Sequence, residues 1–140
     1  MKMAKPYDAS VEAEIGRIGK TETGEDSPAV CARPKDCAAF AKRTHVDALA
    51  VAIGNVHGVY VGAPNLRFDI LEEASRLCDA ALVLHGGTGI SDEDFRRAIS
   101  LGVRKINIAT AMFQAEARVA TAFNGLDYFY TVSPNGGCRI

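Results

Sequence analysis

Four short apolar segments alternate along the chain with segments of helical character, and this alternation constrains the fold more than any other feature. The apolar runs lie at residues 11–15, 48–53, 80–84 and 105–109, bounded by glycine or polar residues as buried strands are. Helices are predicted at residues 34–43, 68–77, 91–102 and 110–123. Pro34 opens the first, an apolar stripe marks the second, and Ser91 and Gly102 bound the third. The first and the fourth are rich in alanine. This order predicts an α/β fold with a parallel sheet.

Four strand–helix units leave a parallel sheet with two edges that lack partners. An eight-stranded (β/α)8 barrel solves this problem with about 250 residues, and the 140 residues of this chain would supply about half of one. A small doubly wound sheet is the alternative. The half-barrel is favoured because polar residues recur where the predicted strands end.

Composition indicates one ordinary globular domain and excludes several classes of partner. The chain is 48% apolar and 24% charged with a net charge of −1, and it has no basic tract, so neither a nucleic acid nor a membrane surface is indicated. No apolar run approaches the roughly 18 residues of a membrane span, and the first residues lack the apolar core of a signal peptide. The four cysteines form no CxxC pair, which favours reduced thiols in a cytoplasmic protein.

Histidines and carboxylates lie near the ends of the predicted strands. His57 follows the second apolar run and His85 the third, while Glu12 and Glu14 share one face of the first. Two imidazoles at the carboxyl ends of nearby strands can converge on a zinc ion, although such histidines are also common as ordinary loop residues. Glu14 is open to the same two interpretations, a site carboxylate or a solvated one. His45 has no such context, and we expect it at the surface or at a helix end.

A glycine-rich turn at residues 86–89 leads into the helix that begins near Ser91. Glycines let backbone N–H groups approach an anion, and Thr88 adds a hydroxyl donor. Together with residues 107–110 on the next unit, the turn indicates a phosphate site of the kind that barrels build from their last loops. The polar segment at residues 19–27 is expected to be a mobile loop that can deliver a carboxylate.

Four ordered motifs, VEAEIGRIG, DALAVAIGNVHGVY, LVLHGGTGI and GVRKINIAT, resemble the zinc-dependent class II ketose-bisphosphate aldolases. The tagatose- and fructose-bisphosphate aldolases are the most similar subgroup, and the motifs span about residues 11–110. The resemblance implies the second half, strands five to eight, of a TIM (β/α)8 barrel. It also implies reversible aldol cleavage of fructose or tagatose 1,6-bisphosphate to dihydroxyacetone phosphate and glyceraldehyde 3-phosphate.

The resemblance also assigns roles to individual residues. His57 and His85 match zinc ligands, Glu14 matches a carboxylate that holds zinc in an alternative position, and Glu25 matches the loop acid that moves a proton. The segments that bind dihydroxyacetone phosphate correspond to Gly58, Gly86, Gly87, Thr88, Asn107, Ile108, Ala109 and Thr110. The implied cofactors are Zn²⁺ and a monovalent cation, Na⁺ or K⁺, and family members commonly form homo-oligomers.

The sequence departs from the family pattern at one zinc ligand. In the family, the first zinc histidine directly follows an aspartate, whereas none of the three histidines in this sequence does so. We therefore expect a C-terminal fragment of an aldolase, inactive as an isolated chain. Residues 1–123 would form the half-barrel, and residues 124–140 an atypical, disordered tail. A non-catalytic phosphate-binding or accessory half-barrel module is the alternative.

Overall fold

The computed structural model describes residues 2–20 and 29–124 of the chain. In chain order the described elements are η1 (Lys5–Tyr7), β1 (Glu12–Ile15), β2 (Gly19–Lys20), α1 (Pro34–Thr44), β3 (Ala48–Val51), β4 (Val56–His57), α2 (Phe68–Leu77), β5 (Ala81–Leu84), α3 (Asp92–Ser100), β6 (Val103–Ile106) and α4 (Thr110–Asn124). Strands and helices alternate, so the predicted α/β organisation is confirmed.

The four longer strands form one parallel sheet in the order β1-β3-β5-β6. Glu14 pairs with Ala50, Ala50 with Val83, and Val83 with Lys105, so these side chains share one face of the sheet. Because all four strands run the same way, their carboxyl ends meet at one end of the sheet. The residues that follow β3 and β5 are therefore brought close together.

The predicted strand at residues 105–109 is wrong in its bounds, because β6 runs from Val103 to Ile106. Gly102, with a φ of 110°, ends the preceding helix and lets the strand begin at once. The carbonyl of Ala109 accepts hydrogen bonds from the N–H groups of Met112 and Phe113, so the chain has by then entered α4.

A second sheet was not predicted from the sequence. The two-residue strands β2 and β4 pair in parallel, with Gly19 beside Val56 and Lys20 beside His57. Strands this short carry no periodic signal. The sheet places His57 in a short strand of its own, after the predicted strand at residues 48–53. It also corrects the predicted mobile loop at residues 19–27, because Gly19 and Lys20 lie in β2.

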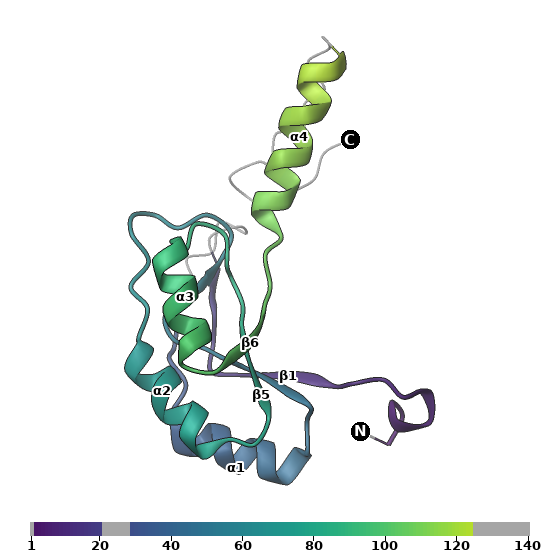
Figure 1. Ribbon diagram of the computed structural model, residues 1–140, viewed down its shortest axis with the longest axis vertical. Coiled ribbons are helices and arrows are strands. Elements are labelled where there is room, and N and C mark those ends of the chain that lie inside the picture. Colours follow the sequence, from purple (N-terminus) through teal and green to yellow (C-terminus); the bar gives the residue numbers. More distant parts are fainter. Residues whose placement is uncertain (1, 21–28, 125–140) are drawn as a thin grey trace.

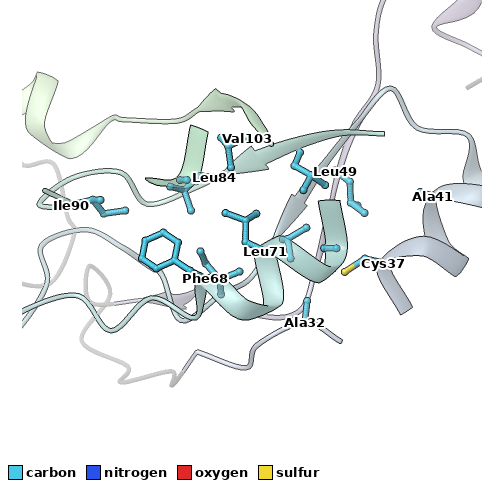
Figure 2. Packing of buried hydrophobic residues seen from close by; sticks show 14 residues of the cluster. Ala32, Cys37, Ala41, Leu49, Phe68, Leu71, Leu84, Ile90 and Val103 are labelled. Carbon is cyan, nitrogen blue, oxygen red and sulfur yellow. The ribbon is translucent and has the colours of Figure 1, made fainter. Parts of the chain in front are cut away.

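The helices α1, α2 and α3 cover the face of the sheet opposite Glu14 and Lys105. Phe68 and Leu71 of α2 face Leu49, Leu84 and Val103 of the sheet, as Figure 2 shows. These side chains are almost fully buried, and burying a side chain of this size stabilises the fold by about 1.5–3 kcal/mol. The core thus lies between the helices and the sheet and leaves the other face to polar side chains.

Helix ends follow the predicted signals. Pro34 occupies the first turn of α1, and the Ser91 hydroxyl accepts a hydrogen bond from the backbone N–H of Asp94 at 3.1 Å to cap α3. Figure 1 shows α4 projecting away from the sheet and the other helices. Within residues 2–20 and 29–124, no helix has the length and apolar character that crossing a bilayer requires.

Candidate metal and phosphate site

The two predicted histidines lie beside each other at the carboxyl ends of the strands. His57 ends β4, His85 follows β5, and their ring centroids are 5.9 Å apart. Glu14 of β1 joins them, so that one ligand atom from each of the three residues lies within 4.8 Å of the others. Imidazole nitrogen and carboxylate oxygen are both zinc ligands, and catalytic zinc sites use three protein ligands. The donor set therefore fits Zn²⁺.

Both ring nitrogens of His85 face carboxylates of the same strand. Nδ1 lies 2.9 Å from Oε2 of Glu14, and Nε2 lies 2.8 Å from Oε1 of Glu12. A neutral imidazole has a single N–H, so it can donate to one of these carboxylates only. The other nitrogen then presents a lone pair, which is the form that binds a metal.

Glu12 also accepts a hydrogen bond from Lys105, whose Nζ lies 2.7 Å from Oε2 of Glu12. Partial burial acts to raise the pKa of Glu12, but the hydrogen bonds and charges of Lys105 and His85 outweigh it and lower that pKa below its ordinary value. Glu12 is therefore ionised near neutral pH. A continuous network joins Lys105, Glu12, His85 and Glu14.

Two polar side chains that the sequence did not single out hold the backbone around His85. Asn55 is fully buried; its Oδ1 accepts from the N–H of Ile53 at 2.9 Å, and its Nδ2 donates to the carbonyl of His85 at 2.8 Å. The Tyr60 hydroxyl accepts from the N–H of Val56 at 3.2 Å and donates to the carbonyl of Gly86 at 3.1 Å. Asn55 thus ties the segment after β3, and Tyr60 ties β4, to the residues that follow β5.

The glycine-rich turn packs against the start of α4. The N–H of Gly87 donates to the carbonyl of Asn107 at 3.0 Å, and the Thr88 hydroxyl accepts from the N–H of Ala111 at 3.1 Å. The Gly87 N–H is thus engaged within the protein, whereas the hydroxyl hydrogen of Thr88 is not used by its bond to Ala111.

The remaining predicted ligand contacts are distributed around this turn. Gly58 is buried directly after His57, Ile108 and Ala109 are exposed between β6 and α4, and Thr110 begins α4. Their roles in binding dihydroxyacetone phosphate stay predictions.

Other predicted residues lie elsewhere. Glu25 is outside the described residues, as is the tail from residue 125. His45 caps the carboxyl end of α1 with a φ of 54°, at the opposite end of β3 from His57, in agreement with its predicted place at a helix end. A groove of about 610 Å³ between α1 and Asp79 lies at that opposite end, beside His45.

Sequence reasoning did not propose roles for Asn55, Tyr60 and Lys105. Asn55 stands in a glycine-flanked segment after an apolar run, which was the available signal for a polar group at a strand end. No sequence signal distinguished Tyr60 and Lys105 from surface residues.

Comparison with known proteins identifies the family. The model of the family described as fructose-bisphosphate aldolase class-II matches residues 1–132. The chain is 41% identical over 138 residues to the D-tagatose-1,6-bisphosphate aldolase subunit GatY of Klebsiella oxytoca, covering 96% of this chain and 46% of that protein. It therefore spans about half the length of this curated relative.

Solved structures agree with this result. The crystal structure of the YdjI aldolase from Escherichia coli K12 superposes with a TM-score of 0.73 at 40% identity, over 94% of this chain and 45% of that one. A putative fructose-1,6-bisphosphate aldolase from Coccidioides immitis gives a TM-score of 0.73 at 27% identity, over 86% and 44%. The predicted family resemblance is confirmed: the chain belongs to the class II fructose-bisphosphate aldolases.

Proposed function

We propose that this chain carries the metal-binding and phosphate-binding part of a class II aldolase active site, with Glu14, His57 and His85 as ligands of Zn²⁺. The observation that carries the proposal is the approach of these three donors to within 4.8 Å of one another at the carboxyl ends of the strands. The fold places catalytic groups at this end in barrel enzymes generally. The substrate class is a ketose 1,6-bisphosphate of the fructose or tagatose type.

The reaction breaks the bond between C3 and C4 of the ketose, releasing glyceraldehyde 3-phosphate and dihydroxyacetone phosphate. A proton leaves the C4 hydroxyl, and a proton is added at C3. Zinc at this cluster would supply Lewis-acid stabilisation of the negative charge that develops as the bond breaks. Glu25 is the residue we assign to proton movement at C3.

The residues of the glycine-rich turn would hold the phosphate of the three-carbon fragment. Thr88 is fixed by the N–H of Ala111, which leaves its hydroxyl hydrogen for a phosphate oxygen. Holding the phosphate fixes the reacting carbon relative to the metal ligands, which lowers the entropic part of the barrier. A monovalent cation beside the phosphate belongs to the same proposal.

The isolated chain is expected to bind ligands but not to cleave the bisphosphate. None of the three histidines in this sequence follows an aspartate, so the family's aspartate–histidine pair has no counterpart here. Cleavage by the purified 140-residue chain, abolished by a chelator, would show this expectation to be wrong. A cytoplasmic location is also proposed, since Cys31, Cys37 and Cys78 are all free thiols.

Calorimetric titration of the zinc-loaded chain with dihydroxyacetone phosphate tests the proposal. Binding should disappear after treatment with a chelator, and inorganic phosphate should bind at least tenfold more weakly because it lacks the carbonyl and hydroxyl oxygens. Binding that survives the chelator, with inorganic phosphate equally good, would overturn the proposal. It would support a non-catalytic phosphate-binding module in its place.

A further inference from the structure

His85 is held at both ring nitrogens, and only one of its two carboxylate partners belongs to the donor cluster. Glu14 faces Nδ1 and is one of the three clustered residues, whereas Glu12 faces Nε2 and is not. Glu12 and Glu14 are two residues apart in β1, so their side chains project on the same face about 7 Å apart. The imidazole lies between them and has little freedom to turn.

Glu12 is itself fixed from the far edge of the sheet. Lys105 lies on β6 and Glu12 on β1, with β3 and β5 between them. The two side chains meet at 2.7 Å on the face of the sheet that also carries the buried residues Ala50 and Val83.

The Glu12–Lys105 pair contributes little to stability, which points to a role in positioning. The side chain of Lys105 is 55% exposed and that of Glu12 26% exposed, and ion pairs at such exposure add little to stability. What the pair does fix is the direction of the second Glu12 oxygen, which faces His85.

Histidines that bind a metal usually donate their other ring N–H to a carboxylate, which fixes the tautomer and makes the ligand nitrogen more basic. We propose that Glu12, held by Lys105, is the positioning residue of the metal site: it accepts the Nε2–H of His85 and so directs the Nδ1 lone pair towards Glu14 and His57. This inference rests on the proposed function, because it takes His85 as a metal ligand. Lys105 acts through Glu12 and balances its charge.

Zinc affinity of the 140-residue chain, measured by competition with a chromogenic chelator, tests this role. Glu12→Gln should weaken zinc binding about tenfold or more, the range found for such partners. Lys105→Met should weaken it less, because the carboxylate remains, and Lys105→Arg should restore affinity to within about twofold because it keeps the charge and a donor. Glu72→Gln, on the exposed side of α2, is the matched control and should change nothing.

A spectroscopic readout separates positioning from a general loss of structure. In the zinc-loaded wild-type chain, the Nε2 proton of His85 should give a downfield, exchange-protected NMR signal, and Glu12→Gln should shift or remove it while far-UV circular dichroism stays unchanged. Zinc binding by the wild-type chain with equal affinity and an equal proton signal in Glu12→Gln overturns this inference and leaves the proposed function standing. No zinc uptake by the folded wild-type chain overturns the proposed function itself, and the inference with it.

Discussion

Asn55 and His85 are joined by a hydrogen bond of 2.8 Å from the buried side-chain amide of Asn55 to the backbone carbonyl of His85. The same amide group accepts from the N–H of Ile53, so one side chain links the end of β3 to the residue that follows β5. The position of a proposed metal ligand is thereby set by its backbone as well as by its ring.

Asn55→Ala should destabilise the chain by about 2–4 kcal/mol, because it leaves the N–H of Ile53 and the carbonyl of His85 without their side-chain partner in the core. Urea unfolding followed by circular dichroism measures this loss. Asn65→Ala is the control, since Asn65 is exposed, and it should change stability by less than about 0.5 kcal/mol. Equal stability of the two variants would contradict the assigned role of Asn55.

Gly86→Ala should be more disruptive than other glycine replacements. Gly86 has a φ of 65°, and a Cβ there would overlap the carbonyl oxygen of Val56, so the backbone next to His85 must move. Gly62 also has a positive φ, of 87°, but a Cβ there meets nothing within 4 Å. Gly62→Ala should therefore cost only the strain of about 1–2 kcal/mol, and Gly86→Ala clearly more. Similar melting temperatures for the two variants would show that the overlap with the Val56 carbonyl does not reduce stability.

Leu71→Ala should cost about 2–5 kcal/mol, since Leu71 is buried between α2 and the sheet and its loss leaves a cavity. Leu77, on the same helix, is 45% exposed and serves as the matched control. Leu77→Ala should cost well under half as much. Chemical denaturation of both variants, with the slopes compared, checks the result.

Stability should fall as pH rises from about 9 to about 11. Burial raises the pKa of the Cys37 thiol to about 11 from an ordinary value of 9.0, with smaller contributions from Cys78 and Asp36. In this window the unfolded chain releases the thiol proton and the folded chain keeps it. The free energy of unfolding therefore falls by about 2–3 kcal/mol by pH 11. Below pH 9 the contribution is fully present.

The comparison that isolates this effect is between the wild-type chain and Cys37→Ala, because other groups also titrate at high pH. The difference in unfolding free energy between the two should stay constant from pH 7 to 9 and shift in favour of the variant above pH 9. A difference that does not change with pH would rule out the buried thiol as its source.

Much of the fold follows from local sequence signals. Strands β3 and β5 are continuous apolar runs, and the Ser91 cap and the Gly102 stop are set by residues next to the helix they bound. The shared face of Glu12 and Glu14 in β1 could also be predicted, because side chains alternate between the two faces of a strand. These features depend on neighbours in the sequence, which is why the sequence predicts them.

The role of Lys105 depends on tertiary structure and could not be predicted in this way. The register between β5 and β6 shifts between Leu82 and Val83, so that Lys105 rather than Arg104 lies beside Val83 on the face of the site. Alternation along β6 cannot reveal such an irregularity. Asn55 and Tyr60 likewise act through hydrogen bonds to His85 and Gly86, which follow β5 and lie 30 and 26 residues further along the chain.

Zinc stoichiometry of the purified chain tests the central claim most directly. The chain should bind one Zn²⁺, His57→Ala and His85→Ala should each lower the affinity at least tenfold, and His45→Ala, at the other end of β3, should leave it unchanged. A folded wild-type chain that takes up no zinc, or one whose zinc binding responds equally to all three substitutions, would contradict the account.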